Sequence, residues 1–167
     1  MASKSSLISL LLVVPIFFFA IYSPACVREV VDVFLNLGEE KMVFYVQETA
    51  TGPNATVTTV AGVNGTSSNL SGFGSVFVID DPVTQGSDNT SKILGRLQGL
   101  EGNSGRYGGP NYHMVSSIIF ENGAGSLEIH GTIRTPLAVR ELAVVGGTGQ
   151  FRYARGYVLV EVVSFDA

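Results

Sequence analysis

From Lys41 onward, the pattern of apolar and polar positions is typical of β-strands rather than helices. Short runs rich in β-branched and aromatic residues alternate with glycine-rich or polar connections. Before Lys41, the apolar residues Val27, Val30, Val31 and Phe34 have a helix-like spacing over barely two turns, so residues 26–40 are interpreted as an N-terminal tether. We predict eight strands, at Met42–Thr49, Thr56–Val63, Gly74–Ile79, Lys92–Glu101, Tyr112–Asn122, Ser126–Arg134, Arg140–Val145 and Ala154–Ser164.

The connections between these strands are too short for helical crossovers, so neighbouring strands are expected to be antiparallel. Closure into a barrel removes the two exposed edges of such a sheet. The sequence therefore predicts an all-β fold, with one eight-stranded antiparallel β-barrel over residues 41–167; a two-sheet sandwich is the alternative. A barrel of this size is about the smallest that can hold one small ligand.

The first 25 residues have the features of a secretory signal peptide. Lys4 precedes an apolar run, Leu7–Tyr22, which is followed by small residues up to Ala25. Cleavage there leaves Cys26 as the first mature residue, and no intrachain disulfide forms because it is the single cysteine. A bacterial lipoprotein cysteine is the alternative, but the leucine expected three residues earlier is missing. We expect a secreted, extracellular protein without a membrane segment in its mature form.

Glycosylation and charge narrow the function further. Four Asn-X-Ser/Thr sequons in loop-like sequence favour a glycoprotein, and their acceptors are Asn54, Asn64, Asn69 and Asn89. The formal net charge of −4 disfavours nucleic acid as a partner, because phosphate binding needs clustered Lys and Arg. A small organic ligand or a protein partner fits this composition better.

Motifs for cofactor chemistry are weak. Gly146–Gly149 resembles a phosphate-binding turn, but too little chain follows it for a βαβ unit, so we interpret it as a turn between the last two strands. The two histidines, His113 and His130, lack the clustered partners of a metal site and are interpreted as surface or loop residues. No metal or other cofactor is expected, and no nucleophile elbow of the Gly-X-Ser-X-Gly type occurs.

Strand alternation places some charged side chains on apolar faces. Glu48 shares a face with Phe44 and Val46, and Arg140 shares one with Leu142. These two charges therefore stand at the ends of faces that point to the core.

Two other polar groups adjoin predicted strands. Arg96 and Gln98 share a face with leucines of their own strand. Asp80 and Asp81 precede Pro82, which indicates either a turn that reverses the chain or a carboxylate at the mouth of a cavity.

Four sequence blocks together resemble the plant dirigent proteins, in order and across essentially the whole mature chain. The blocks are Phe44-Tyr45-Val46-Gln47-Glu48, then Phe73–Val76 leading to Asp80–Thr84, then Gly95–Gly99, and finally Arg140–Leu142 leading through Val144–Gly149 to Phe151–Tyr157. The resemblance implies a secreted, glycosylated apoplastic protein with an eight-stranded barrel of the calycin-like or allene-oxide-cyclase-like type. It also implies a homo-oligomer, a trimer or a dimer.

The resemblance implies a function as well. Dirigent proteins steer the coupling of phenoxy radicals, typically two coniferyl alcohol radicals made by a separate laccase- or peroxidase-type oxidase, towards one stereoisomer of a lignan. In this interpretation the chain directs stereochemistry and has no oxidative centre of its own. Some relatives instead act on quinone methides as cyclising or dehydrating enzymes, and that alternative stays open. A third alternative is a defence-related binding module without chemistry.

The family pattern also assigns roles to residues. Glu48 occupies the place of a pocket aspartate and Arg140 that of a pocket arginine, so both are predicted to be catalytic. The alternative for this pair is a structural ion pair at the barrel mouth. The predicted ligand-binding residues are Phe44, Asp81, Arg96 and Gln98.

The chain departs from the family pattern in several places. Gln47 replaces the usual histidine, and Glu48 itself replaces an aspartate. Glu101-Gly102-Asn103 stands where a tyrosine is common, and Thr132–Val139 lacks a second aspartate found in some members. The substrate and the handedness of the product therefore do not carry over from better-understood members.

Overall fold

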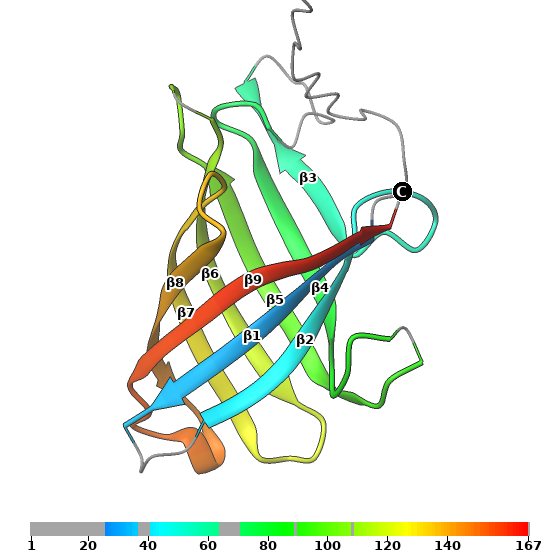
Figure 1. The fold of residues 1–167 in the computed structure, drawn as a ribbon. Coiled ribbons are helices and arrows are strands. Elements are labelled where there is room, and N and C mark those ends of the chain that lie inside the picture. Colours follow the sequence, from blue (N-terminus) through cyan, green and yellow to red (C-terminus); the bar gives the residue numbers. More distant parts are fainter. Residues whose placement is uncertain (1–25, 37–40, 64–70, 89, 108, 167) are drawn as a thin grey trace, which may run out of the picture.

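The computed structural model describes residues 26–36, 41–63, 71–88, 90–107 and 109–166, which form nine strands (Figure 1). A three-residue 3-10 helix, η2 (Gly149–Phe151), lies between the last two strands. Within these ranges no helix has the length and apolar character needed to cross a membrane. The strands are β1 (Cys26–Leu35), β2 (Lys41–Thr49), β3 (Val57–Ala61), β4 (Val76–Thr84), β5 (Ile93–Asn103), β6 (Asn111–Phe120), β7 (Gly125–Arg134), β8 (Val139–Gly147) and β9 (Gly156–Asp166).

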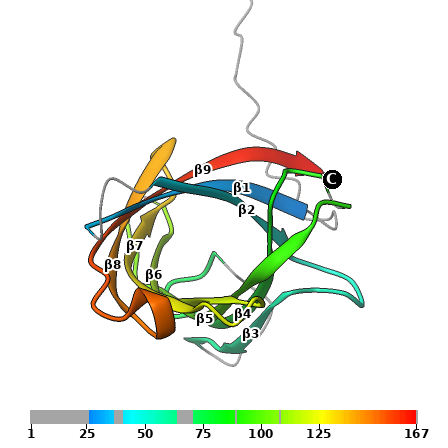
Figure 2. The same ribbon diagram turned by 90° about the horizontal axis from the view of Figure 1, so that it is seen from below.

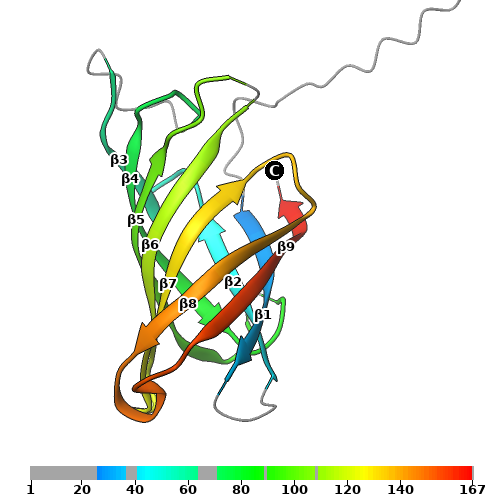
Figure 3. The same ribbon diagram turned by 90° about the vertical axis from the view of Figure 1, so that its left-hand side faces the viewer.

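Eight of the described strands close into a ring. Their order is β2-β1-β9-β8-β7-β6-β5-β4, and β4 returns to β2 through the antiparallel pairs Tyr45–Thr84 and Val46–Val83. The closed ring is visible from below (Figure 2), and Figure 3 shows β5, β6, β7 and β8 following one another along one wall. The predicted eight-stranded antiparallel barrel is confirmed, and the sandwich alternative is wrong.

β1 lies in the segment that was predicted to be a tether, and that prediction is wrong. This strand pairs with β2 on one side and β9 on the other, so it closes the barrel. Val31, Val33 and Leu35 alternate along it and are buried, whereas Phe34 lies on the opposite face and stacks on Tyr157, with ring centroids 4.7 Å apart. Because both faces of the strand carry apolar side chains, the sequence does not show a clear period of two.

The predicted second strand, Thr56–Val63, corresponds to the shorter β3, which lies outside the ring. β3 pairs with β4 from Val57–Ile79 to Ala61–Val76 and with no other described strand. β3 and β2 thus occupy successive parts of the same edge of β4. The number of ring strands is as predicted, but β1 takes the place that was assigned to β3.

Asp80, Asp81 and Pro82 lie inside β4, so their interpretation as a turn is wrong. On one edge of β4, Ile79 pairs with β3 and Val83 pairs with β2. Pro82 lies between these two residues, where the edge passes from one partner strand to the other. A strand tolerates proline at such an edge because proline cannot donate a ladder hydrogen bond. Asp81 alternates with Ile79 and Val83 and is only 2% exposed, whereas Asp80 is exposed on the outer face.

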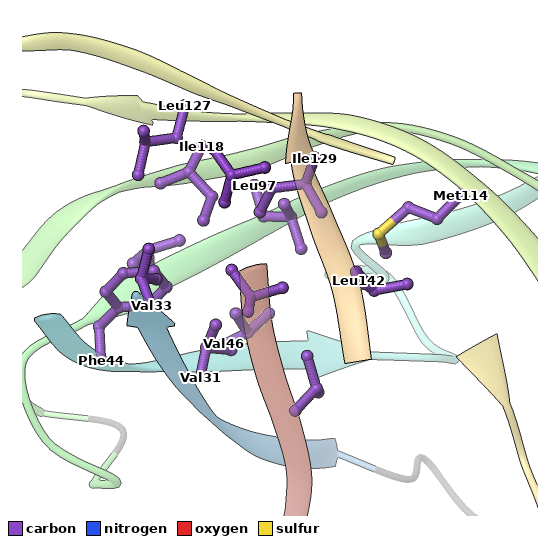
Figure 4. Packing of buried hydrophobic residues seen from close by; sticks show 14 of the residues in the cluster. Val31, Val33, Phe44, Val46, Leu97, Met114, Ile118, Leu127, Ile129 and Leu142 are labelled. Carbon is purple, nitrogen blue, oxygen red and sulfur yellow. The ribbon is translucent and has the colours of Figure 1, made fainter. Parts of the chain in front are cut away.

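Apolar side chains fill most of the barrel interior. Val31, Val46, Leu97, Ile129 and Leu142 converge there from five different strands (Figure 4). Burying one large aliphatic or aromatic side chain stabilises the fold by about 1.5–3 kcal/mol. The largest fully buried residues are Phe44, Phe77, Ile118, Leu127, Val33, Val83, Val144 and Val158.

The glycine-rich segment between β8 and β9 is a hairpin connection, as predicted. Gly149 has a φ of +57°, a left-handed conformation that glycine adopts without strain. At Gly156 a Cβ atom would overlap the carbonyl oxygen of Phe34, so glycine is required for β9 to start against β1. Arg155 donates a hydrogen bond through Nη1 to the carbonyl oxygen of Val145, which gives this arginine a structural role at the turn.

Candidate functional site

A cavity of about 250 Å³ occupies one end of the barrel. Glu29 lies near the start of β1, Glu48 near the end of β2, Glu101 near the end of β5 and Arg140 near the start of β8. Because neighbouring strands run in opposite directions, these starts and ends meet at the same end of the barrel. The lining residues are Val27, Glu29, Glu48, Val57, Phe77, Glu101, Tyr112, Ile133, Thr135, Arg140 and Val162.

Part of the cavity wall is apolar. Phe77 and Tyr112 meet edge to face, with ring centroids 5.5 Å apart and planes at 65°. A narrow apolar void of about 20 Å³ shares Glu29 and Ile133 with the cavity and is otherwise walled by core side chains such as Met114, shown in Figure 4. The cavity thus combines an apolar surface suited to a ring with polar groups at defined positions.

Two carboxyl groups in the cavity retain their protons at neutral pH. Burial raises the pKa of Glu48 to about 8, and the charges of Asp81, Glu101 and Glu29 raise it as well. Burial likewise raises the pKa of Glu101 to about 8, with contributions from Glu29 and Asp81. A protonated, buried carboxyl that lines a cavity is suited to donate a proton to a bound molecule.

Arg140 is paired with Glu29. Its Nη1 atom lies 3.3 Å from Oε1 of Glu29, and the two side chains are 11% and 24% exposed. Burial raises the pKa of Glu29, and the guanidinium of Arg140 opposes that rise. The predicted alternative, an ion pair between Glu48 and Arg140, is wrong because the carboxylate paired with Arg140 is that of Glu29 on β1.

One donor of Arg140 remains available. Its Nε atom is buried and has no hydrogen-bond partner among the residues that the structure describes. A buried donor without an acceptor is unfavourable, by about 1–3 kcal/mol. An oxygen atom of a bound molecule in this cavity would supply the missing acceptor.

Asp81 lies behind the cavity wall. Its Oδ1 accepts a hydrogen bond from the hydroxyl of Thr56. Burial raises the pKa of Asp81 to about 7, the Thr56 hydrogen bond lowers it, and the charge of Glu29 raises it again. Asp81 is therefore a buried carboxyl beside the site that does not line the cavity. Its charge nevertheless raises the pKa of Glu48.

The structure brings together only part of the predicted site. Glu48 and Arg140 line the same cavity, as their alternation patterns predicted. Phe44 is 2% exposed and belongs to the apolar core instead of the cavity lining.

Arg96 and Gln98 do not face the lumen, so their predicted place in the pocket is wrong. Both lie on the outer face of β5, where Nε of Arg96 and Nε2 of Gln98 donate to Oδ1 of Asp80, the latter over 2.9 Å. The inner face of β5 carries Leu97, which is buried, and Glu101. The outer face of β5 also carries the exposed Leu100. Because both faces of the strand therefore contain leucine, the sequence does not distinguish them.

Four polar residues of the cavity were not predicted to belong to the site: Glu29, Glu101, Tyr112 and Thr135. Glu29 was missed because its strand was taken for a tether. Glu101 was noted only as a departure from the family tyrosine. Its spacing from Leu97 is the signal that could have placed it, since residues four apart in a strand share a face.

Several other predictions fall partly outside the described residues. Asn54 is exposed in the turn after β2, whereas Asn64, Asn69, Asn89 and the predicted signal peptide are not described. Cys26, the expected first mature residue, is the first residue of β1 and has a free thiol. The described residues contain no group of three or more His, Cys, Asp or Glu suited to a metal ion.

Comparison with known proteins identifies the family. The model of the Dirigent-like protein family matches residues 39–167, so the match begins after β1. Pterocarpan synthase 1 of Glycyrrhiza echinata is 32% identical over 175 residues, which cover 98% of this chain and 90% of that protein. Dirigent protein 15 of Arabidopsis thaliana is 39% identical over 145 residues, covering 78% and 75% of the two chains.

The solved structures agree with the sequence comparison. The structure of the pterocarpan synthase dirigent protein GePTS1 superposes with a TM-score of 0.61 at 27% identity, covering 84% of each chain. A second pterocarpan synthase dirigent protein, PsPTS1, superposes with a TM-score of 0.57 at 23% identity and supports the fold. With the family model, the relatives and the barrel in agreement, the chain belongs to the dirigent family.

Proposed function

We propose that this protein controls the stereochemistry of a ring closure on a phenolic molecule, through a quinone methide and by proton transfer. The observation that carries the proposal is the cavity itself, in which carboxyl groups with raised pKa values surround one arginine. Two of its relatives are named pterocarpan synthase, and this supports a cyclase in preference to an auxiliary for lignan formation.

In the proposed reaction, the substrate is a phenol with a benzylic hydroxyl and a second, pendant phenol. The protonated Glu48 donates its proton to the benzylic hydroxyl, which leaves as water, while the ring phenol becomes the carbonyl of a quinone methide and its proton restores the Glu48 carboxyl. The pendant phenol then adds to the benzylic carbon, and a carboxyl group of the cavity takes the proton of this phenol and gives its own to the carbonyl oxygen. The net change is loss of one water, so no oxidant is needed.

Arg140 acts on the oxygen that carries the negative charge. Its buried Nε–H has no acceptor within the described structure, so a phenolate oxygen in the cavity would gain a charge-assisted hydrogen bond. Glu29 holds the other arm of the guanidinium and fixes its direction. Glu101 lines the same cavity, and because its pKa is also raised it is a second protonated carboxyl that can donate to a bound molecule.

The size of the cavity favours one small molecule over two. Cavities that take a drug-sized ligand usually measure about 300–1,000 Å³. A cavity of about 250 Å³ suits one phenolic molecule held against Phe77 and Ile133 more readily than a pair of monolignols. Ring closure within one molecule needs only that the two reacting groups of that molecule are held in the correct orientation. The cavity walls supply this orientation.

A second candidate function is stereocontrol of phenoxy radical coupling, with radicals supplied by a separate oxidase. Membership of the dirigent family and the apolar part of the cavity wall favour it. Radical coupling is nearly barrierless, so it would use the walls of the cavity for orientation and would need little from the carboxyl groups.

The sequence predictions of secretion, glycosylation and oligomer formation remain part of the proposal. Cleavage after residue 25 would leave β1 whole, since this strand begins at Cys26. A glycan on Asn54 would stand on an exposed turn, outside the cavity.

One experiment with two arms tests these functions. The first arm supplies a benzylic alcohol with a pendant phenol and no oxidant, and the second supplies coniferyl alcohol with a one-electron oxidant. Products formed with and without the protein are separated by chiral chromatography. An excess of one ring-closed enantiomer in the first arm supports the cyclase, and an excess of one lignan enantiomer in the second supports radical coupling. Racemic products in both arms would reject both functions for these substrates and leave a binding module.

A further inference from the structure

Two histidines from different strands meet on the outer wall of the barrel. His113 lies on β6 and His130 on β7, and the register pairs His113 with Thr132 and Val115 with His130. The histidines are thus diagonal neighbours on one exposed face. Their Nε2 atoms are 3.3 Å apart, and their rings stand at 77° with centroids 5.2 Å apart.

This separation suits two ligands of one tetrahedral metal ion. Zinc binds an imidazole nitrogen at about 2.0–2.1 Å, and two ligands at a tetrahedral angle are then about 3.3 Å apart. The rings meet at a steep angle rather than stacked, and the contact between them is made through the two Nε2 atoms. A hydrogen bond between the two rings accounts for the same contact without a metal, and the experiment below separates the two explanations.

A third residue orients one of the rings. The hydroxyl oxygen of Thr132 lies 3.0 Å from Nδ1 of His113. When Nδ1–H donates to this hydroxyl, the lone pair of Nε2 is left facing His130. Metal-binding histidines usually have such a partner on the second nitrogen, and losing it typically costs about 10–100-fold in metal affinity.

We propose that His113 and His130 form a surface site for a divalent late transition metal of the zinc class, with Thr132 as the residue that positions His113. Imidazole nitrogen is a suitable ligand for zinc, copper and nickel. The described residues offer no third His, Cys, Asp or Glu for a cluster, so water completes the coordination. The site is on the outside of the barrel, separate from the cavity, and a bound ion would clamp β6 to β7.

The affinity is expected to be moderate. Two protein ligands leave half of the tetrahedral shell to water, so we expect a dissociation constant on the order of 10 µM, weaker than that of closed structural sites with four protein ligands.

Isothermal titration of the metal-free mature chain with zinc chloride tests the proposal. We expect one equivalent of zinc to bind, and His113→Ala and His130→Ala each to weaken binding at least tenfold. Thr132→Val should weaken it by about tenfold. Val115→Ala, on the same exposed face but without a ligand atom, should leave it unchanged. Cobalt(II) should give the intense visible absorption of a tetrahedral site in the wild type and lose it in both histidine variants.

Two outcomes would overturn the proposal. One is a wild-type chain that binds no zinc at millimolar concentration, which would leave a simple hydrogen bond between the rings. The other is zinc binding that both histidine variants retain in full, which would assign the ion to another group, such as the carboxyls of the cavity. Circular dichroism serves as the folding control, since both side chains are exposed and their removal should not disturb the barrel.

Discussion

Arg140 of β8 is paired across β9 with Glu29 of β1, with 3.3 Å between Nη1 and Oε1. The first strand therefore both closes the barrel and holds the cation of the cavity. The family match starts only at residue 39, so this partner comes from the part of the chain that precedes it.

Glu29→Gln should destabilise the fold by about 2 kcal/mol, because Arg140 keeps its charge in a mostly buried position without its carboxylate. Urea unfolding at neutral pH measures the change. Asp32→Asn is the matched control, since the Asp32–Lys41 pair also starts from β1 and joins it to β2 at 3.0 Å but is more exposed, and its loss should cost less than about 1 kcal/mol. An equal decrease in the free energy of unfolding in the two variants would contradict the proposed contribution of Glu29 to stability.

Deletion of residues 26–35 should prevent formation of a stable barrel. The deletion removes a strand that pairs along its length with both β2 and β9, and it leaves two unpaired edges that favour aggregation. A chain that begins at Cys26 is the control and should fold. Amide NMR spectra and gel filtration of the two chains provide the measurement. A soluble, well-dispersed spectrum from the shortened chain would show that β1 is dispensable.

The stability of the protein should fall as the pH rises from about 5 to about 8. The pKa values of Glu48 and Glu101 are about 8 in the folded chain, above the ordinary value of 4.5. The folded state therefore binds more protons than the unfolded state in this interval, and its stability decreases until the folded pKa is passed.

Glu48→Gln should flatten this pH profile and stabilise the fold at pH 8 by about 2 kcal/mol, because a neutral amide is not ionised there. Thermal unfolding across the interval measures both effects. Glu141→Gln, at an exposed position of β8, is the control and should keep the wild-type slope. A variant of Glu48 with an unchanged slope would show that this carboxyl is not the source of the pH dependence.

Glu48→Gln should slow the proposed ring closure by about 10²–10⁴-fold, the usual contribution of a general acid. Arg140→Ala should lose stereoselectivity because the substrate oxygen loses its donor, and Glu101→Gln should slow the reaction without abolishing selectivity. Gln98→Ala, on the outer face, should change neither. Wild-type rate and selectivity in Glu48→Gln and Arg140→Ala would reject the assignment of these residues to the site.

Much of the fold could be predicted because strands leave a clear periodic signal. The inward faces carrying Phe44 with Glu48 and Leu142 with Arg140 follow from alternation alone. The signal failed where both faces of a strand are apolar. Phe34 covers the outside of β1 by stacking on Tyr157, and exposed Leu100 covers the outside of β5, so β1 was missed and Arg96 was placed inside.

The candidate site was harder to predict than the fold. The contact between Glu29 and Arg140 joins residues 111 positions apart and depends on the order of strands in the ring. The pKa values depend on burial and on several carboxyls acting together, which no single motif encodes. The same holds for His113 and His130, whose contact arises from the β6–β7 register.

The enantiomeric excess of an oxidant-free ring closure tests the central claim most directly. A benzylic alcohol with a pendant phenol is incubated with the wild-type protein, with Glu48→Gln and without protein, and the product is resolved by chiral chromatography. We expect rapid formation of predominantly one enantiomer with the wild type, and slow, nearly racemic closure in the other two samples. Closure that is equally fast and racemic in all three samples would contradict it.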